Sequence, residues 1–343
     1  MNRQKTRFSV VIPTYNRRAN FLPQAIEGVL QQTFANFELI ISDNGSSDGT
    51  ADYVRALTDP RVRFIRREPT IPPGEHFAVI AREAIGEILV MHQDDDLLHR
   101  EFLARANSAF IAHPDAGLYS CPIWRQQHGH GYTSRLLRHR AMHDDLAVVS
   151  DKLAIFDGPY AAVQLFDPIR QYLPPTMAMR TTTLMAIGGW DPNSAYQSDL
   201  TTEARLLFCG PLVYDPRPGG VSRVHPTNFM RNKSKMFRKM FFHNSYIELI
   251  AAFEQAGQPW RGLLDEYLSR LGEKEILGCL FEWTYYRAPL ELQKLGFAAL
   301  RRSQKSNKRF YRLCFSKLGP RNLARHIYCH WSKAGEVSWR LEP

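Results

Sequence analysis

The chain has few cysteines and no long apolar run, and each shortage excludes a class of protein. Its five cysteines, in 343 residues, are widely spaced and form no C-x-x-C pair. This spacing indicates neither a disulfide framework nor a zinc site, so we expect a reducing compartment. No uncharged stretch approaches the roughly 20 apolar residues that a membrane span requires. The apolar run that begins at Phe8 is too short for a signal peptide and is interpreted as a first strand.

Acidic residues are absent from the segment Leu292–Gly335, which contains eleven lysines and arginines and accounts for the net charge of +10. Basic helices with interleaved aromatic residues bind anionic membrane surfaces, and each Lys or Arg near the surface contributes about 1 kcal/mol. The alternative is an ordinary solvated face of C-terminal helices. No nucleic-acid-binding motif accompanies the charge, so we expect no nucleic-acid partner.

Two acidic clusters each follow an apolar run that is typical of a buried strand. Asp43 and Asn44 follow the first run, and Asp94, Asp95 and Asp96 follow the second. Ligands of open α/β sheets bind beyond the carboxyl ends of the strands, so both clusters are expected at one crevice. Three consecutive carboxylates repel one another unless a cation or a donor-rich ligand holds them. Because Mg²⁺ and Mn²⁺ prefer oxygen ligands, the clusters predict a metal and nucleotide site.

The first 120 residues alternate between strand and helix patterns, as parallel-sheet units do. Strands are expected at Phe8–Ile12, Phe37–Ser42, Arg61–Arg66 and Glu87–His92, and helices at Asn20–Gln31, Thr50–Leu57, Glu75–Ile85 and Arg100–His113. Later strands are expected at Leu118–Trp124, Thr176–Arg180, Leu212–Tyr214 and Val221–His225, with a loop at Gln126–Tyr132, a helix from Ser198 or Asp199 to Cys209, and helices after Thr227. The pattern predicts an α/β protein with a helical C-terminal extension.

Further polar residues lie at predicted strand and helix ends, and each has an ordinary structural alternative. Thr14 and Tyr15 end the first strand, where they could line a base or ribose or form only a turn. Asp199 could be a general base or a helix cap. Arg223 and His225 could hold a diphosphate or complete a metal shell, or be ordinary surface residues. The pair His128 and His130 is interpreted as part of a polar loop and not as a metal site.

Several of these segments together resemble family 2 glycosyltransferases with the GT-A fold. The resemblance rests on Ser9–Arg17, Gln32–Phe34, Glu38–Thr50, Gly86–Asp96, Gly188–Asp191 and Ser198–Leu200, and it covers about residues 7 to 226. It implies a GT-A catalytic domain at residues 1–226, with a nucleotide-sugar half at about 1–115 and an acceptor half at about 116–226. A basic helical region would then occupy residues 227–343.

The resemblance also implies roles for individual residues. The donor would contact Pro13, Thr14, Tyr15, Asn16, Asp43, Asn44, Asp94 and Arg223. The metal, Mg²⁺ or Mn²⁺, would be held by Asp95, Asp96 and His225, and the leading ligand among Asp94, Asp95 and Asp96 stays open. Gly189, Trp190 and Asp191 would line the acceptor site, and Asp199 would be the general base. Two residues depart from the usual pattern: Gln93 replaces the first Asp of the metal motif, and Ser198 replaces the Glu before the base.

The function expected from these observations is inverting, metal-assisted transfer of a sugar from a nucleotide-diphosphate sugar, with a UDP-sugar favoured, to a glycan or lipid-linked acceptor. The setting implied is bacterial synthesis of lipopolysaccharide, capsule or another surface polysaccharide. We expect a cytoplasmic protein bound peripherally to the inner face of the membrane. The alternatives are a non-catalytic scaffold on the same fold and a nucleotidyltransferase, although the chain lacks the Gly-rich loop of the latter.

Overall fold

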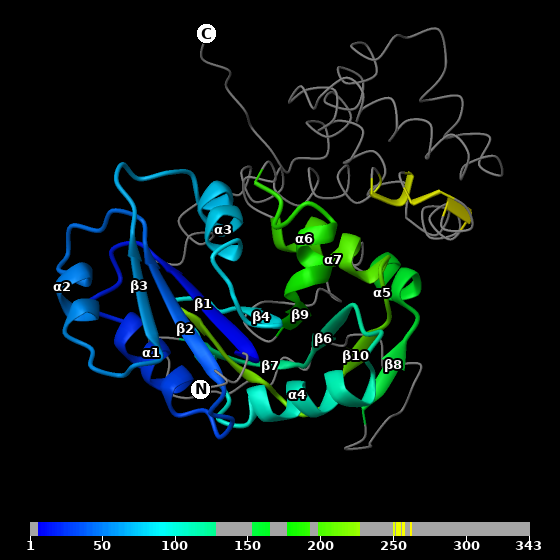
Figure 1. Cartoon of the computed structure of the whole chain (residues 1–343), viewed down its shortest axis with the longest axis horizontal. Coiled ribbons are helices and arrows are strands. Elements are labelled where there is room, and N and C mark those ends of the chain that lie inside the picture. Colours follow the sequence, from blue (N-terminus) through cyan, green and yellow to red (C-terminus); the bar gives the residue numbers. More distant parts are fainter. Residues whose placement is uncertain are drawn as a thin grey trace, which may run out of the picture. The chain divides into compact units, whose positions relative to one another are not determined.

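The computed structural model describes residues 6–127, 153–164, 177–192 and 198–226, and a few positions between 250 and 262 (Figure 1). The chain divides into two compact units, Met1–Lys233 and Ser234–Pro343. The first unit contains all the strands described below. Most of the second, including the basic segment 292–335, lies outside the described residues, as do His128 and His130. No helix in the described part of the chain is long and apolar enough to cross a membrane.

The larger sheet of the first unit has eight strands in the order β3-β2-β1-β4-β9-β6-β10-β8. The four predicted N-terminal strands are present and are all parallel to one another. β9 is antiparallel to both of its neighbours and β8 is antiparallel to β10, so the sheet is mixed. The strands are β1 (Phe8–Thr14), β2 (Phe37–Asp43), β3 (Val62–Arg66), β4 (Ile88–Met91), β6 (Leu118–Ser120), β8 (Ala154–Phe156), β9 (Met177–Arg180) and β10 (Leu212–Tyr214).

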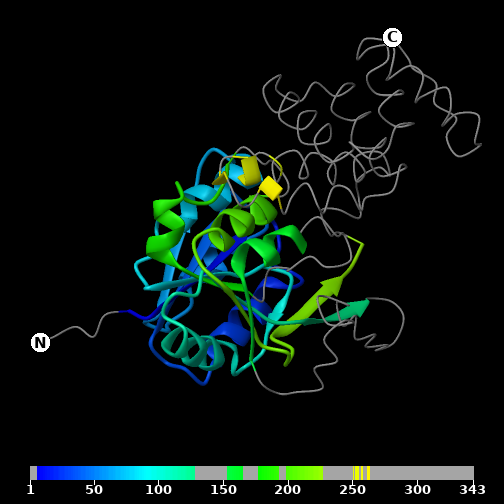
Figure 2. The same cartoon turned by 90° about the vertical axis from the view of Figure 1, so that its right-hand side faces the viewer.

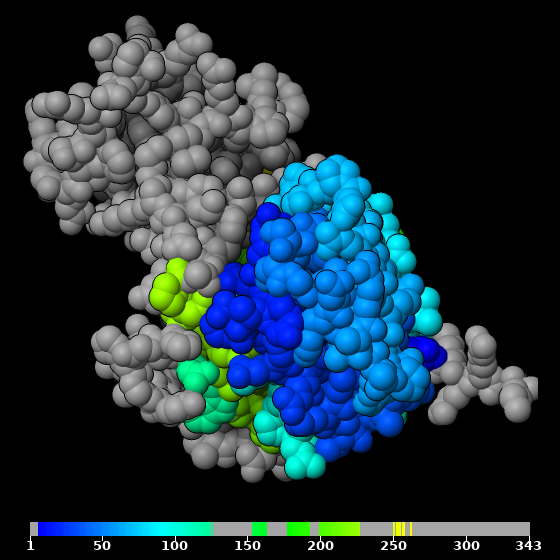
Figure 3. Space-filling view, turned by 90° about the vertical axis from the view of Figure 1, so that its left-hand side faces the viewer, coloured from blue at the N-terminus to red at the C-terminus, as the bar shows by residue number. Residues whose placement is uncertain are grey.

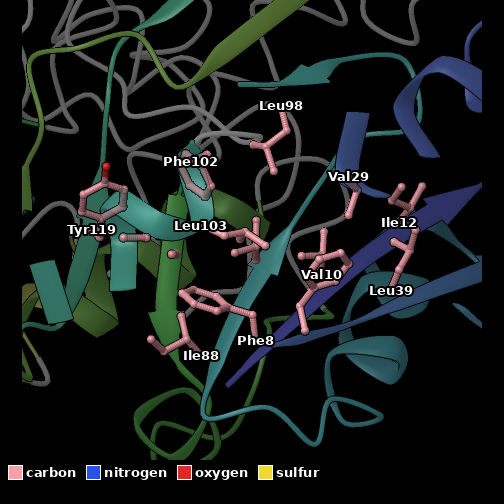
Figure 4. Close-up of a cluster of buried hydrophobic side chains, with 14 of the residues drawn as sticks. Phe8, Val10, Ile12, Val29, Leu39, Ile88, Leu98, Phe102, Leu103 and Tyr119 are labelled. Carbon is pink, nitrogen blue, oxygen red and sulfur yellow. The ribbon is translucent and has the colours of Figure 1, made fainter. Parts of the chain in front are cut away.

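Helices lie on both faces of this sheet, as Figure 1 shows. They are α1 (Leu22–Leu30), α2 (Thr50–Arg55), α3 (Pro73–Ala81), α4 (Phe102–Ala112), α5 (Gly158–Gln164), α6 (Thr181–Ala186) and α7 (Ser198–Leu207). Alternate residues of β1, among them Phe8 and Val10, pack with apolar residues of α1 and α4, including Val29 and Phe102, in one buried cluster (Figure 4). Each such side chain contributes about 1.5–3 kcal/mol when fully buried. This core holds the carboxyl ends of β1, β2 and β4 at one edge.

A second sheet of three short strands lies beside the first (Figure 2). Its strands, in order, are β5 (Leu97–Leu98), β11 (Gly220–Val224) and β7 (Ile123–Gln127). β5 follows directly after Asp96, and Leu97 pairs with Val221 of β11. The small sheet therefore brings the acidic cluster next to the residues that follow Val221.

The small sheet corrects two sequence predictions. The single strand expected at Leu118–Trp124 is wrong: β6 ends at Ser120 and belongs to the large sheet, whereas β7 begins at Ile123 and belongs to the small one. Pro122, which has no N–H to donate, lies between them, and its carbonyl accepts a hydrogen bond from the Gly219 N–H. The loop expected from Gln126 begins instead with the last residues of β7.

Candidate active site

The two loops that follow β1 and β2 are joined to each other at the edge of the large sheet. Thr14 lies opposite Asp43 in the strand register, and the Asn44 N–H donates to the Thr14 carbonyl at 2.9 Å. Asn16 has a left-handed φ of 54° and bonds to Ser46 and Ser47. Pro13 is buried, whereas half of the Tyr15 side chain is exposed. The four residues from Pro13 to Asn16 therefore meet the Asp43 loop, as the sequence predicted.

Asp43 is completely buried at the end of β2, and its charge is balanced by an arginine. Its Oδ2 atom lies 2.5 Å from Nη1 of Arg66, which ends β3, and its Oδ1 atom accepts a hydrogen bond from the Ser46 N–H. About a quarter of the Arg66 side chain is exposed. The guanidinium thus faces both Asp43 and the solvent at the sheet edge.

Asn44 holds a neighbouring loop. Its side-chain amide donates to the Ile71 carbonyl at 2.8 Å and accepts from the Ile71 N–H at 3.0 Å. Because this side chain bonds to backbone on both sides, it fixes the segment before α3 against the Asp43 loop. If the Asn44 amide contacted a bound ligand, that contact would compete with its two hydrogen bonds to Ile71.

The acidic loop begins with Asp94, which lies beside the end of β1. Burial and the negative charge of Asp95 raise the pKa of Asp94 to about 7, against the opposing effect of Arg17, whose Nε lies 3.9 Å away. The Thr14 hydroxyl lies close enough to favour the charged form of Asp94 but makes no well-directed hydrogen bond. Asp94 is therefore a carboxyl group that a nearby cation would strongly favour in its charged form.

The next two acids contact β11 and the residue after it. The Oδ2 atom of Asp95 lies 3.0 Å from Nε2 of His225, and burial lowers the pKa of that histidine. The Oδ1 atom of Asp96 accepts a hydrogen bond from the Arg223 N–H at 2.8 Å. Burial and the charge of Asp95 raise the pKa of Asp96 well above its usual range. One strand end therefore contacts both acids.

The Arg223 side chain joins the acidic loop to α1. Its guanidinium donates to the carbonyls of Asp95 and Asp96, to the Gln24 side chain and to the Phe21 carbonyl. The Phe21 ring lies under that guanidinium at 4.7 Å and stacks on the His225 ring at 4.1 Å. In Figure 3 the yellow-green residues near β11 lie beside dark-blue N-terminal ones. Arg223 is 5% exposed and its guanidinium bonds to protein groups. It therefore holds the acidic loop in place through these hydrogen bonds.

These residues suit a hard divalent cation. In the described part of the chain no three His, Cys, Asp or Glu side chains are grouped closely enough to hold a metal by themselves. Asp95 and His225 do form a carboxylate and imidazole pair, and neutral imidazole is the form that binds metal. The raised pKa of Asp94 and of Asp96 shows that their charges are poorly compensated. Magnesium usually takes one or two carboxylates and completes its shell with water and substrate phosphates, which fits this set.

Asp199 lies in the first turn of α7, where its Oδ1 atom accepts from the Leu200 N–H at 3.0 Å. Burial raises the pKa of Asp199 to about 6. Among the described residues, only backbone hydrogen bonds oppose this shift, and no cation contributes to it. A carboxylate with a pKa just below neutral pH is suited to take a proton from a hydroxyl.

The predicted acceptor residues form a turn that is tied to α7. Gly188 and Gly189 both have positive φ angles, of 95° and 86°, which glycine adopts without strain. Asp191 bonds to Thr201 and Thr202 of α7. Trp190 is 1% exposed and stacks on Phe77 of α3 at 6.0 Å. The turn therefore lies close to α7, and the Trp190 ring is part of the core.

Four residues near these groups were not predicted from the sequence. Arg66 balances Asp43, and Arg17 faces Asp94. His92 precedes the acidic loop, is fully buried, and neither ring nitrogen has a hydrogen-bond partner in the described structure; burial lowers its pKa to about 3. Glu203, one helical turn after Asp199, is a buried acid. The sequence offers one indication for each of these residues. Each is a charged or ionisable residue at a strand end or on an apolar helix face.

Comparison with known proteins agrees with this geometry. Residues 9–173 match the family model described as Glycosyl transferase family 2. An uncharacterized glycosyltransferase of Rickettsia felis is 36% identical over 97 residues, which cover 28% of this chain and 16% of that protein. The GalNAc(5)-diNAcBac-PP-undecaprenol beta-1,3-glucosyltransferase of Campylobacter jejuni is 32% identical over 114 residues, which cover 32% of this chain and 35% of that protein. The matched regions span well under half the length of these relatives.

Solved structures show the fold at lower identity. TarS residues 1–349 of S. aureus, in complex with UDP-GlcNAc, superimpose with a TM-score of 0.61 at 14% identity, covering 98% of this chain and 94% of that one. The mannosyltransferase PcManGT of Pyrobaculum calidifontis, in complex with GDP-Man and Mn²⁺, gives a TM-score of 0.50 at 15% identity and covers 98% and 77%. The chain thus has the GT-A fold, and its residues 9–173 match glycosyl transferase family 2.

Proposed function

We propose that the protein transfers a sugar from a nucleotide-diphosphate sugar to a hydroxyl group of a glycan or lipid-linked acceptor, with inversion at the anomeric carbon and with a divalent metal. The observation that carries this proposal is the convergence of Asp43, the loop Asp94–Asp96 and His225 at one edge of the sheet. In the proposed complex the nucleotide base lies beside Asp43 and the metal lies beside Asp95. TarS in complex with UDP-GlcNAc and PcManGT with GDP-Man and Mn²⁺ support this arrangement by their shared fold.

Each residue has a role in the proposed reaction. Asp43 accepts a hydrogen bond from the base, and Thr14 and Asp94 lie where the ribose would follow. Asp95 and His225 hold the metal, which when bound offsets charge on the departing diphosphate. Asp199 takes the proton from the acceptor hydroxyl as that oxygen attacks the anomeric carbon. A single base suffices, because direct displacement forms no covalent intermediate with the protein.

The acceptor proposed is a lipid-linked or surface glycan of a bacterium. The name of the Campylobacter jejuni relative includes an undecaprenol-linked acceptor, which supports this class. The basic segment 292–335 is suited to an anionic membrane surface, and we propose peripheral binding to the inner face of the cytoplasmic membrane. Sedimentation with liposomes tests this part, since equal recovery with neutral and with anionic vesicles contradicts it.

The donor is identified by thermal shift of the full chain with UDP, GDP, dTDP and CMP, each with and without Mn²⁺. A ligand at about 100 times its Kd adds ~2.7 kcal/mol to the stability, which is a shift of a few degrees. We expect one diphosphate, UDP in the first instance, to raise the Tm only with metal. The absence of any shift favours a non-catalytic scaffold, and release of pyrophosphate from a nucleotide substrate favours a nucleotidyltransferase.

A further inference from the structure

Helix α7 contains two acids, Asp199 and Glu203, and the proposed reaction uses only Asp199. Its residue is 1% exposed, and neither carboxyl oxygen has a hydrogen-bond partner in the described structure. An unpaired ionised carboxylate is too costly to bury in this way, and the usual outcome is that the group keeps its proton. The environment thus indicates a neutral carboxyl group.

The position of Glu203 relates it to Asp199. The two acids are four residues apart on α7, so their side chains lie on the same face of the helix. Burial raises the pKa of Glu203 well above its usual range, and the charge of Asp199 raises it further. Asp199 therefore ionises first, near pH 6, while Glu203 retains its proton.

No basic side chain on the described elements that pack against α7 pairs with Glu203. α6 has no titratable residue, and β6 provides only Tyr119, whose hydroxyl donates to Asp215. α5 provides Tyr160, which is half exposed. The Arg205 side chain, on α7 itself, extends toward Gly188. Its Nη2 atom would lie 3.3 Å from a β-carbon built at that glycine. In the described part of the chain Asp199 is thus the charged group that acts on Glu203.

We propose that Glu203 is a positioning residue for Asp199: it stays protonated in the working protein and, after a side-chain rotation from the unpaired position that it has in this structure, donates its carboxyl O–H to the ionised Asp199, orienting the base toward the acceptor. This inference rests on the proposed function through the role of Asp199. The Asp199 oxygen that accepts from the Leu200 N–H leaves its second oxygen to receive the Glu203 proton. A leucine at position 203 would pack as well as Glu203 but would offer no hydrogen-bond donor to Asp199.

Two variants separate a donor from a space-filling role. Glu203→Gln keeps the shape and an N–H donor without charge, whereas Glu203→Met keeps the volume and removes the donor. We expect E203Q to retain the kcat and the acid limb of the pH profile of the original protein. We expect E203M to lower kcat about 10-fold at unchanged KM and to move the acid limb up by about one pH unit, as the loss of one hydrogen bond to a charged group predicts. Equal kcat and equal limbs for E203Q and E203M overturn the proposal.

A stability measurement tests the protonation of Glu203 independently of activity. A carboxyl group with a raised pKa in the folded state lowers stability as the pH rises from its unfolded pKa, about 4.3, toward its folded pKa, because unfolding then releases a proton. E203Q should therefore gain in Tm over the original protein between pH 5 and 8, with the gain vanishing below pH 4. A Tm difference that does not depend on pH shows that Glu203 is not a buried neutral acid.

Failure of the two proposals can be distinguished. If the original protein transfers no sugar from any donor, the proposed function fails, while the pH-dependent Tm gain of E203Q still reports the protonation of Glu203. If transfer occurs and Asp199→Asn does not slow it, the base assignment fails. If both of these hold and E203M behaves as E203Q does, only the positioning role of Glu203 is overturned.

Discussion

His225 and Asp95 meet across 130 positions of the sequence, with the histidine Nε2 atom 3.0 Å from the aspartate Oδ2 atom. The contact depends on the small sheet, in which β5 continues the acidic loop and β11 leads to His225. A carboxylate and a neutral imidazole at this distance are two donors that one divalent cation can share after a small adjustment. The proposed metal site therefore depends on pairing between distant parts of the chain.

Replacing Asp95 with Ala should abolish metal-dependent nucleotide binding, because the carboxylate paired with His225 is lost. Isothermal titration of UDP with and without Mn²⁺ measures this effect. Asp52→Ala is a matched control, since that carboxylate is highly exposed on α2 and pairs only with Arg55 in the described structure. Undiminished metal-dependent binding by D95A contradicts the ligand role.

Replacing Arg223 with Lys should reduce the affinity for the metal–nucleotide complex about 10- to 100-fold, the range seen when groups that orient metal ligands are removed. Lysine cannot reach the Asp95, Asp96 and Phe21 carbonyls together, because it lacks the planar fork of five N–H donors. Arg55→Lys, at an exposed site on α2, is the control. The same titration checks the prediction, and an R223K affinity within twofold of the original shows that the guanidinium does not support the loop.

Replacing Asp43 with Ala should destabilise the fold by roughly 3 kcal/mol, because it removes one partner of a buried ion pair and the acceptor for the Ser46 N–H. Denaturant unfolding measures this cost. Arg66 is a quarter exposed and can be partly solvated after the change, which keeps the effect below that of a fully buried pair. A change under 0.5 kcal/mol indicates that the pair contributes little to stability.

The rate of transfer should rise as the pH increases through about 6 and then level off. The raised pKa of Asp199 means that the base is protonated, and inactive, below this point and ionised above it. The pH dependence of kcat between pH 4.5 and 8 measures the limb. A flat profile across pH 6 in a protein that remains folded contradicts the assignment of the base.

Much of the N-terminal half could be predicted because its strands are continuous apolar runs followed by turn residues. Phe8, Phe37 and Ile88 begin β1, β2 and β4 within a residue of the expected positions, since buried parallel strands leave little ambiguity in the pattern. Asp43 and Asp94 were expected at the same edge for the same reason, and the parallel register places them there.

The rest depends on contacts that no local pattern encodes. The split of Leu118–Trp124 into β6 and β7 follows from which distant strands those residues pair with. Arg66 and Arg17 were not predicted because a surface arginine and one that balances a buried acid look alike in sequence. The burial of Glu203 could not be predicted, because a single acid in a helix sequence is usually exposed to solvent. In these three cases tertiary packing, and not the type of residue, decides the strand boundary, the ion pair or the burial.

The central claim is tested most directly by incubating the full chain with UDP-, GDP- and dTDP-sugars, each with Mn²⁺, with Mg²⁺ or with EDTA, and measuring release of the nucleoside diphosphate. We predict that one donor is cleaved in a metal-dependent manner, and that Asp199→Asn slows transfer to an acceptor by about 10²- to 10⁴-fold while donor binding stays nearly intact. Transfer at the original rate by D199N, or no diphosphate release from any donor with either metal, would contradict the account.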